Sequence, residues 1–237
     1  MSFLTAEWRK LVFANYVIDP KVLEPYVPFG TELDLWQDKC YISLVGFMFV
    51  DVRLLGIKIP FHVNFEEVNL RFYVRRLEKG EWKRGVVFIK EIVPKPAITF
   101  VANTIYQENY QTLEMRHRWE ETDTSRVVEY QWKMQQDWFT FQVNADRATS
   151  SIEPGGETEF ITEHYWGYAH AGPKKSNEYE VTHPKWEQYK VNDYQIDVDY
   201  GKVYGPDFAF LNQEQPSTVM LAEGSAITVE GKRKISE

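Results

Sequence analysis

The chain has 237 residues, of which 43% are hydrophobic, and 27 basic and 35 acidic side chains give it a net charge of −8. The apolar content is enough to bury a sizeable core, which excludes global disorder. The acidic balance argues against a nucleic-acid-binding protein, because such proteins depend on basic patches that face phosphates. Cys40 is the single cysteine, so an internal disulfide and a cysteine-cluster metal site are excluded.

No targeting segment is visible at the N-terminus, where Glu7, Arg9 and Lys10 interrupt any apolar stretch before it reaches signal-peptide length. The longest nearly uninterrupted apolar run covers residues 41–50. A spanning helix needs about 20 such residues. We therefore expect a cytoplasmic protein with no membrane partner.

The first half of the chain favours strands. Asp19 and Pro20 supply an N-cap and a first-turn proline for a short helix that continues to residue 26. Residues 94–96 open a second helix, whose apolar side chains recur at helical spacing through Ile105. A charged link over residues 77–83 has the length of a hairpin. Strands are predicted over residues 10–18, 31–36, 40–54, 64–76 and 84–93.

The second half continues with strands and a few interruptions. Residues 147–157 contain Pro-Gly-Gly and are predicted as a long surface loop. Helices are predicted over residues 157–168 and 197–203. Further strands are predicted over residues 113–120, 126–134, 139–143, 178–182, 189–191, 208–211, 219–222 and 226–229.

Long strands in hairpin order with a few inserted helices are typical of an antiparallel α+β protein that is mostly β. The chain contains no long linker, no low-complexity tract and no internal repeat. We therefore expect one domain over residues 1–237.

Residues 62–75 form the most informative segment. As a strand, the segment puts Glu67, Asn69, Arg71, Tyr73 and Arg75 on one face. This polar face could be solvated and salt-bridged, as is routine in antiparallel sheets. Alternatively, it lines the interior of a barrel, where Arg71 suits a carboxylate ligand because its planar fork binds both oxygens.

Lys90 and Glu91 interrupt an apolar run with one charge for each face of the strand. Because an unpaired buried charge is costly, each must find a partner or a wet cavity. A structural ion pair between Lys90 and Glu67 is one interpretation. The other is an amine whose pKa is lowered by burial, able to form a Schiff base with a carbonyl compound.

Glu108 is flanked by Tyr106 and Tyr110 just after the second helix. This pattern fits an acid or a ligand anchor, and it equally fits a helix end with hydrogen-bonded aromatic side chains. The five histidines show no ligand spacing, so we expect neither a metal nor a cofactor.

Several motifs in the same order make the chain similar to the YqjF-like family of uncharacterised conserved bacterial proteins. The resemblance runs from about residue 8 to 229 and implies the acetoacetate decarboxylase-like fold, a cone-shaped antiparallel β-barrel with flanking helices and a site in its interior. The motifs are FEEVNLRFYVRR, RGVVFIKEIVPKPA, the Tyr-x-Glu-x-Tyr pattern at 106–110, TEHYWGY and LAEGSAITVEG.

The decarboxylases carry a Gly-Arg-Glu-x-x-Gly-x-Pro-Lys-Lys stretch that supplies a Schiff-base lysine and a neighbouring cation. The resemblance aligns it with residues 106–115 here, so that Glu108 matches the glutamate and Glu114 and Met115 stand where the two lysines would be. The same resemblance aligns Glu66 or Glu67 with the strand position of a second glutamate in the decarboxylase site. Without the lysine pair, the decarboxylase mechanism is not supported.

Three functions remain open. The first is a small-molecule-binding protein, or an enzyme without the lysine pair, that uses the barrel interior; its ligand is small and could bear a carboxylate, with Glu67, Asn69, Arg71 and Tyr110 binding it and Glu108 as an acid. The second is an imine-forming enzyme that acts on a keto acid through Lys90. The third is a scaffold whose barrel is filled by side chains. The aromatic content of 16% would serve either a core or the interface of a homo-oligomer.

Overall fold

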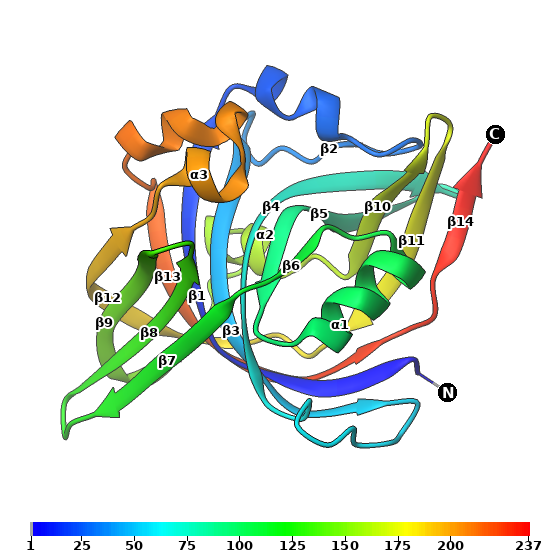
Figure 1. Cartoon of the computed structure of the whole chain (residues 1–237). Coiled ribbons are helices and arrows are strands. Elements are labelled where there is room, and N and C mark those ends of the chain that lie inside the picture. The colour runs from blue at the N-terminus through cyan, green and yellow to red at the C-terminus, as the bar shows by residue number, and fades with distance from the viewer. Residues whose placement is uncertain (1) are drawn as a thin grey trace.

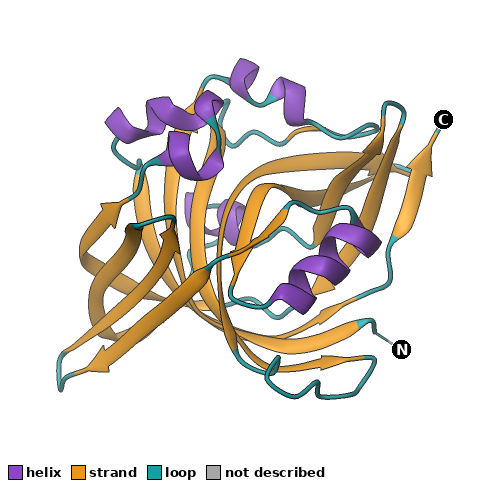
Figure 2. Cartoon of the chain, viewed as in Figure 1, coloured by secondary structure: helices purple, strands orange, loops and turns teal. Residues whose placement is uncertain are grey.

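A computed structural model describes residues 2–237 as a large, mostly antiparallel sheet with short helical segments (Figures 1 and 2). Its strands are β1 Leu4–Ile18, β2 Glu32–Leu33, β3 Cys40–Leu54, β4 Phe65–Glu78, β5 Glu81–Val93, β6 Tyr110–Thr112, β7 Glu114–Glu121, β8 Ser125–Met134, β9 Asp137–Ser151, β10 Trp166–Gly172, β11 Lys175–Thr182, β12 Glu187–Asp197, β13 Thr218–Val229 and β14 Arg233–Ser236. The helices are α1 Pro96–Val101, α2 Glu157–Thr162 and α3 Tyr200–Tyr204, with the short segments η1 Pro20–Val22, η2 Glu24–Tyr26, η3 Ala102–Tyr106 and η4 Pro206–Gln213. No helix within residues 2–237 is both long and apolar enough to cross a bilayer.

Seven strands close into a ring. They run in the order β11, β10, β5, β4, β3, β1 and β13, and Val181 and Thr182 of β11 pair back with Val229 and Thr228 of β13. The strands β12, β9, β8 and β7 continue from β13 as an arm that leans away from the ring (Figure 1). This arrangement confirms the predicted α+β, mostly β class and the barrel with a few flanking helices.

The ring strands carry apolar side chains on both faces, because the fold covers both. On β3, Ile42 and Leu44 belong to one buried group, whereas Val45 and Phe47 belong to the other. The first group packs against the arm and α3 on the outside of the ring. The second group faces the ring interior, where the cavity lies.

Three predicted elements are wrong. The helix predicted over 157–168 ends at Thr162, and Trp166 instead opens β10, which pairs in parallel with Gly85 of β5. The start of the predicted loop at 147–157 still belongs to β9, because Ser151 pairs with Glu187 of β12. These segments form strands through pairings with distant parts of the chain.

The predicted strand over 208–211 is instead part of the 3-10 segment η4. Pro206 stands at its start, where the fixed φ of proline suits a helical turn. Phe208 and Leu211 are buried, while Phe210 is exposed. That spacing of three residues matches a 3-10 helix, which has three residues per turn.

Candidate functional site

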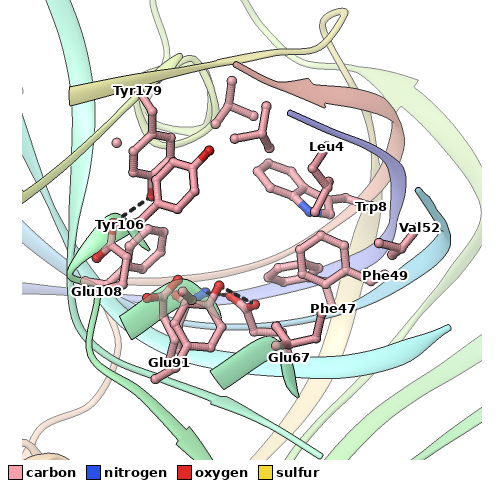
Figure 3. A pocket seen from close by; sticks show the side chains of 18 of the residues that line it. Leu4, Trp8, Phe47, Phe49, Val52, Glu67, Glu91, Tyr106, Glu108 and Tyr179 are labelled. Carbon is pink, nitrogen blue, oxygen red and sulfur yellow. Dashed lines mark hydrogen bonds between the residues drawn. The ribbon is translucent and has the colours of Figure 1, made fainter. Parts of the chain in front are cut away.

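A cavity of about 380 Å³ lies inside the ring. All seven ring strands contribute side chains to its wall, and α1, η3 and loop residues such as His62, His164 and Trp186 add to it. In Figure 3, Trp8, Phe47 and Phe49 form an aromatic wall that faces the carboxyl groups of Glu67, Glu91 and Glu108. A cavity of this size is typical of a small-molecule site, and it does not fit the hypothesis of a barrel filled by side chains.

Strand β4 places three polar side chains on the cavity wall. Glu67, Asn69 and Arg71 alternate along it with Val68 and Leu70, which pack outside the ring. Glu67 is 2% exposed, Asn69 1% and Arg71 8%. The part of the polar face formed by Glu67, Asn69 and Arg71 therefore lines the interior, as the barrel interpretation predicts, whereas Arg75 further along the strand is partly exposed and pairs with Glu32.

A β-bulge in β5 decides which of its two charged residues faces the cavity. Arg71 pairs with Phe88 and Leu70 pairs with Lys90, so Ile89 is an extra residue in the ladder. Such an extra residue reverses the alternation of side chains beyond it. Glu91 consequently lies opposite Asn69 and lines the cavity, while Lys90 lies on the outer face with Leu70.

Lys90 is therefore outside the group of residues that the structure brings together. Its ammonium donates a hydrogen bond to the carbonyl of Val203 in α3, and burial lowers its pKa. The predicted ion pair with Glu67 is wrong, because the bulge turns Lys90 away from Glu67. The same geometry leaves no lysine on the cavity wall within residues 2–237.

Three carboxyl groups meet on one wall of the cavity with few donors. Glu67 accepts hydrogen bonds from Asn69 Nδ2 at 2.9 Å and from Tyr110 Oη at 3.1 Å. Glu108 accepts one from Tyr179 Oη at 2.9 Å. Glu91, 2% exposed, has an Oε2 atom with no hydrogen-bond partner among the described residues.

These surroundings favour the protonated forms of the acids. Burial raises the pKa of Glu67 to about 7, although bonds from Asn69 and Tyr110 and the charge of Arg71 oppose it. Burial raises the pKa of Glu108 to about 8, with the charge of Glu67 adding to it. Burial and the charges of Glu108 and Glu67 raise the pKa of Glu91 well above its usual range. Carboxyl groups that titrate near neutrality suit acid–base work.

Arg71 is the one arginine or lysine side chain on the cavity wall within the described chain. Its Nη2 donates to the carbonyl of Ile161 at 3.4 Å, and its Nε is buried without a partner. The guanidinium also lies over the rings of Phe13 and Tyr73, at 5.3 Å and 5.6 Å from their centroids. A guanidinium offers five N–H donors, so this buried cation is short of acceptors.

A second polar group borders the cavity at His164. Its Nε2 lies 3.3 Å from Asp34 Oδ2, which also accepts a bond from Arg84 Nε at 2.7 Å. Burial lowers the pKa of His164 to about 4, so the ring is neutral at pH 7. Burial opposes ionisation of Asp34, but the bonds from His164 and Arg84 outweigh it and hold the pKa of Asp34 below its usual value.

The structure thus brings together Glu67, Asn69, Arg71, Glu108 and Tyr110 and leaves out Lys90. Glu114 and Met115, which stand where the decarboxylase lysines would be, lie on β7 away from the cavity wall. Of the two glutamates compared with a decarboxylase acid, Glu67 lines the cavity, whereas Glu66 faces the other way and bonds His117 Nδ1 at 2.6 Å.

Sequence reasoning did not select Glu91, Tyr179 or His164 as site residues. Glu91 depends on the bulge, which no residue pattern marks. Tyr179 does follow from one signal, since it lies in a predicted strand among alternating polar residues. Within residues 2–237, no three histidine, cysteine or acidic side chains are arranged to hold a metal ion.

Comparisons with known proteins relate the chain to one family. A model of the family DUF2071, described as an uncharacterized conserved protein, matches residues 5–226. The uncharacterized protein YqjF of Bacillus subtilis (strain 168) is 30% identical over 110 residues, which span 46% of this chain and 44% of YqjF.

Several solved structures share the fold at low sequence identity. An acetoacetate decarboxylase-like enzyme from Sphingomonas wittichii RW1 superposes with a TM-score of 0.67 at 10% identity, over 100% of this chain and 94% of its own. The enduracididine biosynthesis enzyme MppR in complex with pyruvate gives 0.69 at 13% identity, over 100% and 91%. The acetoacetate decarboxylase of Legionella pneumophila gives 0.67 at 10% identity, over 98% and 87%. These likenesses confirm the acetoacetate decarboxylase-like fold that the sequence predicted.

Proposed function

This chain belongs to DUF2071, a family of uncharacterized conserved proteins, and we propose from its cavity that it binds a small carboxylate-bearing molecule inside the ring. The observation that carries this proposal is Arg71, a guanidinium that is 8% exposed, lines the cavity and has a single protein acceptor at 3.4 Å among the described residues. A ligand carboxylate would supply the missing acceptors in the paired geometry that guanidinium favours.

The remaining wall suits the rest of such a ligand. Trp8, Phe47 and Phe49 offer apolar contact to a short hydrocarbon body. Asn69, with an Oδ1 that has no partner within residues 2–237, and Tyr110 offer polar contacts beside the carboxylate. Because no lysine lines the described cavity, this function proceeds without an imine.

Calorimetric titration of hexanoate, with hexanol as the uncharged analogue, tests the proposal. We expect hexanoate to bind and Arg71→Met to weaken it by about tenfold or more, since hydrogen bonds to charged groups contribute about 1.5–3 kcal/mol. Arg75→Met is the matched control, because Arg75 lies on the same strand but pairs with Glu32 at 2.8 Å outside the cavity. Equal binding of hexanoate and hexanol, or no loss in Arg71→Met, would contradict the proposal.

A second candidate function is proton transfer at the carbon next to the carboxylate or carbonyl of the bound molecule. Glu108 supports it, because its pKa of about 8 lets it both give and take a proton near neutral pH. The test is exchange of the C3 protons of 2-oxobutanoate in heavy water, followed by NMR. Exchange that is faster with the protein than without it, and is lost in Glu108→Gln, would support this function; equal rates would exclude it for this substrate.

A further inference from the structure

The cavity contains buried groups of opposite charge type that the protein leaves unpaired. Arg71 lacks acceptors, and Glu91 has a carboxyl oxygen without a donor. Within residues 2–237, no lysine, arginine or histidine nitrogen lies within 4 Å of Glu67, Glu91 or Glu108. Leaving a buried polar atom without a partner is costly. A ligand that binds only Arg71 would leave the Glu91 oxygen without a hydrogen-bond donor.

The two groups that lack partners, Arg71 and Glu91, lie at different positions along the sheet. Glu91 lies opposite Asn69, and Arg71 stands two residues further along β4. Two residues of strand span about 7 Å. A molecule with a short chain between two polar groups is suited to span a backbone separation of this order.

The charged groups that act on Glu67 and on Glu91 also differ in sign. The charge of Arg71 opposes the rise in the pKa of Glu67, whereas the charges that act on Glu91 are those of Glu108 and Glu67, which raise its pKa against the hydroxyl of Tyr110. The titratable groups that face Glu91 are Glu67 from β4, Glu108 and Tyr110 from the segment after α1, and Tyr179 from β11. None of these is a cation, so the Glu91 end is electrostatically open to one.

We propose that the ligand is a zwitterion whose carboxylate binds Arg71 and whose basic nitrogen binds Glu91, with a spacer of about four to six carbon atoms between them. The spacer packs against the aromatic wall of Trp8, Phe47 and Phe49 (Figure 3). This inference rests on the proposed function, because it uses the same cavity and the same contact with Arg71. No covalent step is involved: the ammonium replaces the proton of Glu91, and that proton leaves to solvent.

Three probes with the same six-carbon chain test the inference by calorimetry at pH 7.5: hexanoate, 6-aminohexanoate and hexylamine. We expect 6-aminohexanoate to bind about tenfold tighter than hexanoate, because it adds a charge-assisted bond. In Glu91→Gln, the ratio of the two affinities should fall to near one. Glu66→Gln is the matched control, because Glu66 is a neighbouring glutamate that faces His117 outside the cavity.

The outcomes separate the inference from the proposed function. If hexanoate binds as tightly as 6-aminohexanoate, the zwitterion is wrong and the carboxylate site stands. If neither acid binds, or if hexylamine alone binds, the carboxylate site fails and the inference fails with it. Should Glu91→Gln unfold, Glu91→Met, which keeps a similar volume without a carboxyl group, tests the same contact, and an unchanged affinity ratio in that variant would overturn the inference.

Discussion

Glu178 and Glu91 are both buried glutamates on ring strands, with 0% and 2% of their surface exposed. Glu178 lies 2.6 Å from Arg233 Nε and accepts bonds from Tyr168 Oη at 3.0 Å and from Arg76 at 3.4 Å. Glu91 faces a cavity and has no cation within 4 Å in the described chain. The comparison shows that two equally buried carboxyl groups differ in their surroundings: Glu178 lies among cations, whereas Glu91 has no cationic neighbour within residues 2–237 and borders an open volume.

The largest expected effect concerns the paired carboxylate. Glu178→Gln should lower the free energy of unfolding by about 3 kcal/mol, because removing one member of a buried charge cluster leaves the remaining charges without a partner. Arg76 and Lys83 also contact Glu78, which keeps the loss at the lower end of the usual range. Urea unfolding measures it, with Glu91→Gln as the comparison; a larger loss in Glu91→Gln would reverse the contrast between the two sites.

The second prediction is a fall in stability with rising pH that originates in the cavity. Glu67 and Glu108 have pKa values of about 7 and about 8 in the native state, raised from 4.5. Between pH 4.5 and 8 the unfolded chain loses protons that the folded chain keeps, so the free energy of unfolding falls through that window. Because each pKa unit corresponds to about 1.4 kcal/mol, we expect a fall of several kcal/mol from these two groups.

Urea unfolding at pH 5, 6, 7 and 8 checks this pH dependence. The double variant Glu67→Gln and Glu108→Gln should show a flatter profile than the wild type. Glu66→Gln serves as the control, because Glu66 faces His117 and not the cavity. A wild-type slope that survives in the double variant would mean that other groups cause it.

The third prediction tests the donor of Glu108. Tyr179→Phe removes the hydroxyl that lies 2.9 Å from its carboxylate and should cost about 1 kcal/mol. Since that bond favours the ionised form, the variant should also raise the pKa of Glu108 further. Tyr106→Phe is the control, because its hydroxyl donates only to the Glu230 carbonyl at 3.4 Å. Carbon NMR titration of the carboxyl group would contradict the assignment if the pKa stayed fixed or fell.

The smallest expected effect concerns Lys90, on the outer face of β5. Lys90→Met should change hexanoate affinity by less than about twofold, because the ammonium contacts Val203 and not the cavity. Borohydride treatment in the presence of pyruvate should leave Lys90 unmodified, as peptide mapping would show. An adduct on Lys90 would mean that this strand exposes the other face in solution.

The predictable part of the molecule is the part that local alternation governs. The bounds of β3 follow from an apolar run of strand-forming residues, and the common face of Glu67, Asn69 and Arg71 follows from a period of two residues. The helical start at Pro96 follows from proline chemistry.

The rest depends on pairings between distant residues. Trp166 becomes a strand residue by pairing with Gly85, across about 80 positions of sequence. The Ile89 bulge depends on how β5 meets β4, and nothing in the apolar run around it marks the extra residue. The sequence assigns Lys90 and Glu91 to opposite faces of the strand without indicating which face is inside, so it does not identify Glu91 as the residue in the cavity.

Because of the bulge at Ile89, the register of β5 against β4, and not the residue types alone, decides whether a basic or an acidic side chain faces the cavity. In a regular ladder that ran on from Phe88, Ile89 would oppose Leu70, Lys90 would oppose Asn69, and an amine would replace a carboxyl inside the ring. Two relatives with the same residues at 88–91 but different bulges would therefore present opposite charges to a ligand. An ungapped alignment of this strand would not distinguish them, so the register must be established before chemistry is transferred between such relatives.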